Sequence, residues 1–173
     1  MTANEKSRLK LLRPFGAIWF LLYTGCLYFF SFLGPVLVVE HFRSLPAAAL
    51  LALAIVGFGA AGIVFLLLLI LTRKVLIASA PKTGLMTVLC EDGRRWFSVA
   101  LTTNVLVNSP FRWMTSGLSL FASWYYRGMG AKMPDSVLLG AGSRITDPWF
   151  LEVGEDVVIG ADAVILGHLG HGE

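Results

Sequence analysis

The sequence has few charged residues and very few cysteines. Charged side chains make up 14% of its 173 residues and hydrophobic side chains 56%, whereas a soluble domain carries about 25% charged residues. So little charge argues against an ordinary soluble domain. The two cysteines, Cys26 and Cys90, lie in an apolar segment and a polar one, which argues against a disulfide scaffold and against a cysteine-rich metal site.

Two long stretches contain no charged residue. They are residues 15–39 and 45–71, and each is longer than the roughly 20 residues that cross a hydrocarbon core of about 30 Å. A cleavable signal peptide has an apolar region of only about 7–15 residues, so the first stretch is predicted to be a permanent span. Because only a short turn separates the two stretches, residues 1–74 are predicted to form a basic arm and a two-helix transmembrane hairpin.

Charge is distributed unevenly around these spans. Intramembrane ionisable residues usually mark a transport pathway, and their absence here disfavours a transporter or channel. Lys and Arg cluster before the first span and after the second, with only Arg43 in the turn, so we expect a multi-pass protein with both termini in the cytoplasm. Basic residues beside spans meet anionic headgroups. The lipid bilayer is therefore the expected partner, and nucleic acid is not.

Residues 75–132 keep bulky apolar groups but contain no third span. Five of them follow a spacing of 3, 4, 3 and 4, which predicts one apolar stripe along one helix; they are Phe111, Met114, Leu118, Phe121 and Tyr125. The segment is predicted to be an amphipathic, membrane-interfacial linker. Its stripe suits a helix in the headgroup plane, and it equally suits a cap on the domain that follows.

Residues 133–173 repeat in sixes. The first position of each hexad is aliphatic or Met, and a two-residue insertion, Leu151 and Glu152, falls in the middle; these positions are Met133, Leu139, Ile145, Val153, Ile159 and Ile165. Such a period is typical of a β-helix, with Asp156 and Asp162 at its corners. Trp149 fits the pattern poorly. The alternative interpretation is two ordinary β-hairpins with chance spacing.

The segment from Trp124 to Gly167 resembles the bacterial hexapeptide-repeat acyltransferases, whose domain is a left-handed parallel β-helix. The stretches WYYRGMGAKMPDSVLLG and ITDPWFLEVGEDVVIGADAVI look most like membrane-linked members such as the terminal domain of polylysine synthetase-like enzymes. The resemblance implies a protein of the bacterial inner membrane that transfers an acyl group from acyl-CoA or another thioester to a hydroxyl or amine. It also implies a homotrimer with sites between neighbouring β-helices.

Residues 133–170 supply about two coils. Repeat folds generally need about three units, so we expect an incomplete β-helix in a truncated chain. Two functions follow from this expectation. The protein is a membrane-anchored acyltransferase-family member, inactive if coils are missing, or it is a non-enzymatic membrane module whose coils pair with a longer partner chain.

Acyl transfer needs a base, and neutral His suits this role near pH 7. The candidate catalytic residues are His168 and His171, at the start of the next coil, although without downstream sequence a role as corner or surface residues of a polar turn is favoured for each. Two histidines without a third ligand do not predict a metal site. Three acids of the tail, by which we mean residues 133–173, are expected to be solvated corner residues; they are Asp147, Glu152 and Glu155.

Overall fold

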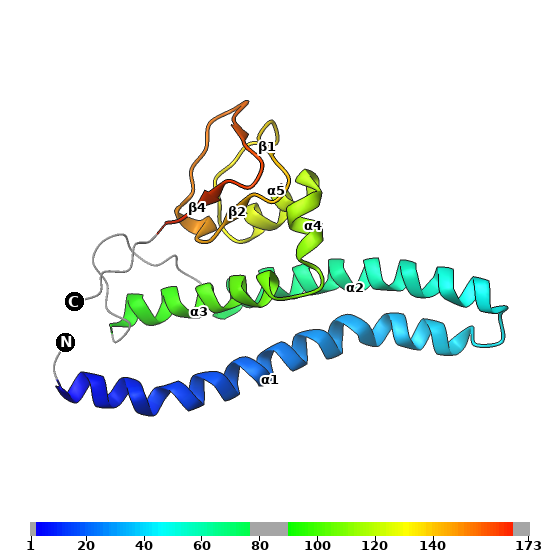
Figure 1. Cartoon of the computed structure of the whole chain (residues 1–173), viewed down its shortest axis with the longest axis horizontal. Coiled ribbons are helices and arrows are strands. Elements are labelled where there is room, and N and C mark those ends of the chain that lie inside the picture. The colour runs from blue at the N-terminus through cyan, green and yellow to red at the C-terminus, as the bar shows by residue number, and fades with distance from the viewer. Residues whose placement is uncertain (1–2, 77–89, 168–173) are drawn as a thin grey trace. The chain divides into compact units, whose positions relative to one another are not determined.

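The computed structural model describes residues 3–76 and 90–167 (Figure 1), with side chains for residues 17–75 and 90–167. The described chain contains five α-helices, one 3-10 helix and four short strands. Two compact units meet between Phe65 and Leu66, so that the second helix begins in one unit and ends in the other. Each unit is described by itself.

The first unit is built from α1 (Ala3–His41) and the greater part of α2 (Ala47–Leu76). The segments Ala17–His41 and Ala47–Val75 are 25 and 29 residues long and apolar enough to cross a membrane, as the charge-free stretches predict. Pro46 precedes α2, a position at which a missing N–H is tolerated. In the turn, Leu45 N donates to Phe42 O at 3.0 Å.

Small and aromatic side chains form the contact between the two helices of the first unit. A Cβ added to Gly57 would lie 3.1 Å from Pro35 Cβ, so glycine permits a close approach of the two helices there. The rings of Tyr28 and Phe65 stack with centroids 5.3 Å apart. Gly59 takes no part in this contact, since no described atom lies within 4 Å of its added Cβ.

In the second unit, α3 (Glu91–Val107), α4 (Arg112–Gly117) and α5 (Ser119–Gly128) precede the strands. The prediction of one continuous apolar helix is wrong, because Leu118 is extended, at φ −123° and ψ 101°, between α4 and α5 and its side chain is 43% exposed. Gly117 is a weak helix former. The break lets Ser119 Oγ accept a 3.1 Å bond from Leu139 N, which ties α5 to the first strand.

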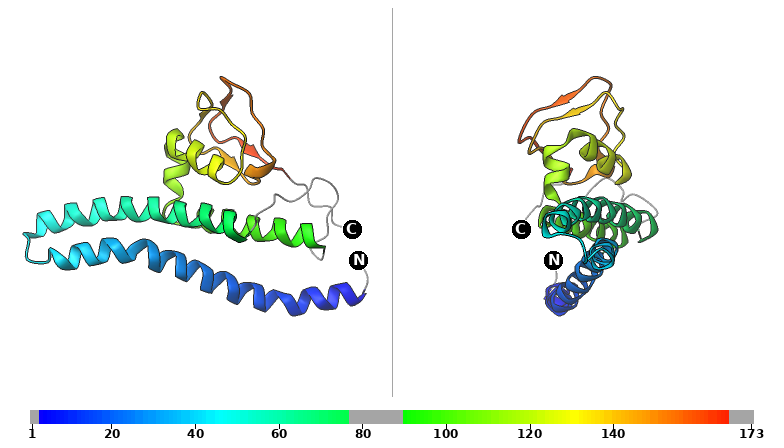
Figure 2. Two further views of the ribbon diagram at one scale, coloured as in Figure 1. Left: turned by 180° about the vertical axis from the view of Figure 1, so that it is seen from behind. Right: turned by 90° about the vertical axis from the view of Figure 1, so that its right-hand side faces the viewer.

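The tail folds as two stacked turns of chain, which we call the first and second coils. Strand β1 (Leu138–Leu139) pairs in parallel with β3 (Val158–Ile159), and β2 (Arg144–Ile145) pairs in parallel with β4 (Val164–Ile165). A parallel bridge joins Lys132 to Glu152. Figure 2 shows the second coil following the path of the first. Every pairing joins residues 20 positions apart, as the hexad register with its insertion predicts.

The parallel pairing contradicts the alternative of two β-hairpins, whose strands would be antiparallel. The two-residue insertion is absorbed at one corner by the 3-10 helix η1 (Pro148–Phe150). There Trp149, which fits the hexad pattern poorly, is buried with 8% of its surface exposed. The insertion therefore accounts for an offset of 20 where three hexads alone would give 18.

Two aspartates occupy corners in the left-handed backbone region. Asp156 has φ 58° and Asp162 has φ 54°, a conformation that Asp tolerates better than most residues. Ser136 Oγ accepts a 2.9 Å bond from Asp156 N, one coil away. Gly142 stands at the same position as Asp162 in the first coil, with φ 77°, and an added Cβ there would collide with the Asp162 carboxylate.

Gly140 and Gly160 offer a matched test of this stacking. A Cβ on Gly140 would lie 2.6 Å from the carbonyl carbon of Gly160, whereas no described atom lies within 4 Å of a Cβ on Gly160. Because backbone atoms cannot yield cheaply, we expect Gly140→Ala to lower the free energy of unfolding by about 1–3 kcal/mol. We expect Gly160→Ala to change it by less than about 0.5 kcal/mol. Thermal unfolding of both variants in detergent measures the difference, and equal midpoints would contradict this packing.

Candidate functional site

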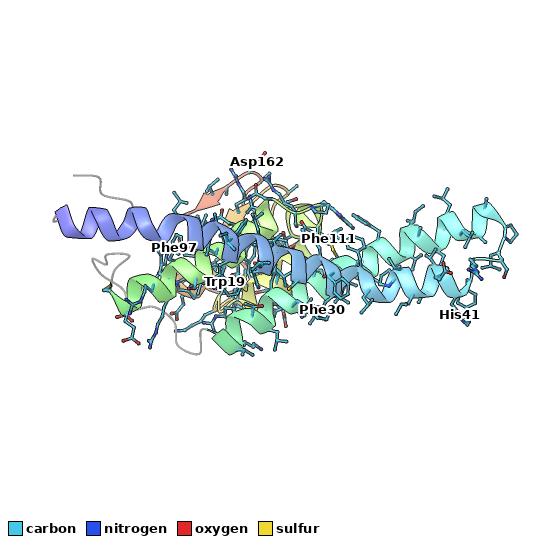
Figure 3. All side chains as sticks on the ribbon, turned by 90° about the horizontal axis from the view of Figure 1, so that it is seen from below. Trp19, Phe30, His41, Phe97, Phe111 and Asp162 are labelled. Atoms are coloured by element: carbon cyan, nitrogen blue, oxygen red, sulfur yellow. The ribbon has the colours of Figure 1, made fainter. Side chains whose placement is uncertain are left out.

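The candidate catalytic histidines, His168 and His171, lie outside the described residues. The remaining histidine, His41, is exposed at the last turn of α1, beside the turn to α2 (Figure 3). Its ring meets that of Phe42 edge-on, with centroids 4.8 Å apart. The described part of the tail, residues 133–167, therefore brings no histidine to the coils, and their chemistry rests on other side chains.

A pocket of about 270 Å³ lies inside the second unit. Its wall comes from the end of α3, from α4 and α5, and from strands β2 and β4 of the two coils. The apolar part of the lining includes Leu106, Ile145, Val164 and Leu166. The pocket is thus a product of the tertiary fold, since its residues are separated by as many as sixty positions in the sequence.

The pocket keeps its shape because helices and coils are tied together by hydrogen bonds. Ser116 O, at the end of α4, accepts a 2.7 Å bond from Gly142 N in the first coil. Tyr126 Oη, on α5, accepts a 3.4 Å bond from Ile145 N. Both bonds join a helix to a coil residue within three positions of Ser143, so the lining is fixed from two sides.

Asp147 provides a further tie, beside the pocket. Its side chain is buried, with the residue 2% exposed, and its carboxylate accepts bonds from Trp96 Nε1 at 2.9 Å, Thr146 Oγ1 at 2.8 Å and Gly167 N at 3.0 Å. These donors come from α3, from the first coil and from the end of the second. The expectation that Asp147 is a solvated corner residue is wrong, because its carboxylate is buried and these three donors take the place of water.

The other two acids of that expectation are exposed, as predicted. Glu155 is exposed, and Glu152 forms a 3.0 Å pair with Lys132 in which both side chains are about three-quarters exposed. Such a surface pair contributes little stability. Of these three acids, only Asp147 is buried.

The pocket lining carries two guanidinium groups and no carboxylate. Arg112 lies on α4 and Arg144 on β2, and no carboxylate of the described residues lies within ion-pair distance of either. Burial raises the pKa of Tyr126, while both guanidiniums act in the opposite direction on the same hydroxyl. Tyr126 is therefore a neutral hydroxyl at pH 7 within the electrostatic field of both cations.

One hydroxyl group in the lining, that of Ser143, differs from those of two neighbouring threonines. Thr103 and Thr115 donate to backbone carbonyls of their own helices, so their protons are occupied. Ser143 Oγ is buried and has no hydrogen-bond partner among the described residues. A buried hydroxyl without a partner costs about 1–3 kcal/mol. Its presence in a polar pocket indicates that a ligand or water satisfies it.

A second candidate surface is the face of the second coil turned away from the first. No described atom lies within 4 Å of an added Cβ at Gly154 or Gly160. The first coil presents the same backbone to the second coil and is covered by it. This open face thus has the geometry of a stacking surface.

Neither candidate surface resembles a metal centre: among the side chains that the structure describes, in residues 17–75 and 90–167, no three of His, Cys, Asp or Glu lie close enough to hold a metal ion. Comparison with known proteins adds no identification. No family model, no curated protein and no solved structure matches the chain. Interpretation of the sites therefore depends on the residues themselves.

Sequence reasoning identified the coils but missed the pocket. Arg112 and Arg144 look like ordinary interfacial and corner residues in the sequence, and Ser143 like a small fifth position. The sequence gives a partial signal for Arg112 alone: residues 103–134 contain three basic residues and no acid, whereas Asp147 follows Arg144 by three positions. Only the packing of α4 against the coils brings the two arginines to one cavity.

Replacement of Asp147 tests whether its carboxylate holds α3 to both coils. In Asp147→Asn, an amide N–H would face donors that now bind carboxylate oxygens, so we expect the free energy of unfolding to fall by about 1–3 kcal/mol. The matched control is Glu152→Gln, which removes an exposed charge and should change stability by about 0–1 kcal/mol. Thermal unfolding in detergent gives both values. Equal effects of the two substitutions would show that Asp147 holds nothing in place.

Proposed function

We propose that the chain is a membrane-anchored acyltransferase-family protein whose tail is a left-handed parallel β-helix. The observation that supports this proposal most directly is the constant offset of 20 residues in three parallel pairings, at Lys132, Leu138 and Arg144. Three pairings per turn of chain are what a three-sided coil requires. The resemblance of residues 124–167 to hexapeptide-repeat transferases supplies the reaction class.

In the proposed reaction, a hydroxyl or amine of the acceptor attacks the carbonyl carbon of an acyl thioester such as acyl-CoA. A carbon–oxygen or carbon–nitrogen bond forms, the carbon–sulfur bond breaks, and the thiolate leaves. His168 or His171 removes the acceptor proton and passes it to the thiolate. No metal takes part in this scheme.

The first test is thioester turnover by the full chain in detergent or nanodiscs, measured as release of free thiol from acetyl-CoA or a longer acyl-CoA in the presence of amine and alcohol acceptors. Loss of a general base typically lowers a rate by about 100- to 10,000-fold. We therefore expect a fall of that size in His168→Ala or in His171→Ala, with unchanged thermal unfolding.

The matched control is His41→Ala, at the exposed turn of the first unit, which should leave turnover unchanged. No thiol release from any acyl-CoA by a folded, wild-type chain would contradict the enzymatic proposal. Turnover that survives both tail substitutions would contradict the assignment of the base.

We further propose that α1 and α2 cross the bacterial inner membrane with both termini in the cytoplasm. The two helices of sufficient length and the basic residues at their outer ends support this topology.

Single cysteines placed in a background without Cys26 and Cys90 test this topology. A membrane-impermeant maleimide added to the periplasmic side should label Ser44→Cys and leave Ser7→Cys unlabelled. The reverse pattern would invert the topology.

A second candidate function is a non-enzymatic module whose coils pair with a further β-helix, from a homotrimer partner or a longer homologous chain. The observation that favours it is the open stacking face, with its uncovered glycines Gly154 and Gly160.

If the coils pair through this face, Gly160→Arg should disrupt a self-assembled complex in detergent, as measured by sedimentation. Leu120→Arg is the control, because Leu120 is an exposed residue of α5. An unchanged sedimentation coefficient in Gly160→Arg would exclude this face from the assembly.

A further inference from the structure

The pocket in the second unit contains more hydrogen-bond donors and positive charge than its own acceptors use. Arg112 and Arg144 both line it, and neither is paired with a carboxylate of the described residues. Elsewhere in the same unit basic side chains are paired: Arg127 with Asp135, and Lys132 with Glu152. An uncompensated pair of guanidiniums over one cavity favours an anion there.

The hydroxyl groups add to this excess of donors. Tyr126 Oη accepts from Ile145 N, so its proton is available to an acceptor in the pocket. Ser143 is 2% exposed, and its Oγ lines the pocket without a partner among residues 90–167. A buried hydroxyl that finds no acceptor in the protein is the second, independent sign of a ligand. The pocket therefore offers donors from four side chains.

The number and charge of these donors indicate the class of anion. A carboxylate has two oxygens and one charge, whereas a phosphomonoester has three terminal oxygens and a charge of about −1.5 to −2 at pH 7. The phosphomonoester matches two guanidiniums and two hydroxyls more closely than the carboxylate does. Arg is also the side chain that binds phosphate in bidentate geometry.

The size and apolar wall of the pocket define the rest of the ligand. At about 270 Å³ it lies just below the roughly 300–1,000 Å³ of pockets that enclose a drug-sized molecule. It therefore accommodates a headgroup and the first part of a substituent. Val164 and Leu166 belong to the lining and are 47% and 55% exposed, so an apolar substituent that leaves the pocket meets aliphatic side chains.

We propose that this pocket binds a phosphomonoester attached to an apolar group, with Arg112, Arg144, Ser143 and Tyr126 as the phosphate ligands. The proposal uses none of the histidines of the proposed transfer reaction, and occupation of the pocket does not depend on that reaction. The phosphomonoester can come from a lipid or from a soluble metabolite. Both sources present the same phosphate to the same four side chains.

Titration calorimetry on the full chain in a non-ionic detergent tests the site. The probes are dihexanoyl phosphatidic acid for the lipid source and glycerol 3-phosphate for the soluble source. We expect one phosphomonoester per chain, and the tighter of the two probes identifies the source. Dihexanoyl phosphatidylcholine, which has the same acyl chains but a zwitterionic phosphodiester, should bind at least tenfold more weakly than the phosphatidic acid.

Variants connect this binding to the named residues. Arg112→Gln and Arg144→Gln should each weaken binding of the tighter probe by roughly 10- to 100-fold, as expected for a hydrogen bond to a charged group. Arg127→Gln removes the same charge from a guanidinium that is paired with Asp135 outside the lining, and should change binding by less than about twofold.

Ser143→Ala provides a readout that a purely structural role would not give. The substitution removes a buried hydroxyl without a partner, so the thermal midpoint of the unliganded protein should stay the same or rise, while phosphomonoester binding weakens several-fold. The proposal is overturned if neither phosphomonoester binds at millimolar concentration. It is equally overturned if hexanoate binds as tightly as the phosphomonoesters, or if Arg127→Gln weakens binding as much as Arg112→Gln and Arg144→Gln do.

Discussion

The second unit depends on the buried carboxylate of Asp147. Three donors, from α3 and from both coils, donate hydrogen bonds to its two oxygens. One side chain therefore fixes the position of the coils against the helix that precedes them. A buried carboxylate is tolerated only when its lone pairs are used. The 3-10 helix η1 begins directly after Asp147, and Trp149 within it is buried as well.

The pocket follows from that arrangement. Because α3 is held at Asp147, and α4 and α5 are held at Gly142 and Ile145, the three helices cover one side of the coils and leave the other side open. The two unpaired arginines, which are both exposed, lie on elements that meet at the covered side. The open side contains the uncovered glycines of the second coil. A binding site and a stacking surface thus lie on the same small scaffold without sharing residues.

Much of the fold could be predicted from the sequence because its elements follow from patterns within short stretches of sequence. The two long apolar helices follow from charge-free stretches, and the register of the coils follows from six aliphatic first positions, of which Leu139 and Ile145 pair with Ile159 and Ile165. The break at Leu118 and the burial of Asp147 could not be predicted. Both depend on contacts between residues about 20 to 50 positions apart, such as Ser119 with Leu139 and Trp96 with Asp147, and periodicity carries no information about such contacts.

The position of the unit boundary within α2 changes how the length of this helix is understood. The residues that follow the boundary belong to the unit of the coils, where Ile70 leaves no room for a side chain on Gly128: an added Cβ would lie 2.5 Å from Ile70 Cδ1. The remaining residues, 47–65, rise about 28 Å at 1.5 Å per residue, which is close to the thickness of one hydrocarbon core. Leu66, Leu69 and Ile70 are buried within the protein, whereas Leu67 and Leu71 in the same segment are 48% and 55% exposed. Hydropathy alone therefore does not define which apolar residues of α2 are free to face lipid.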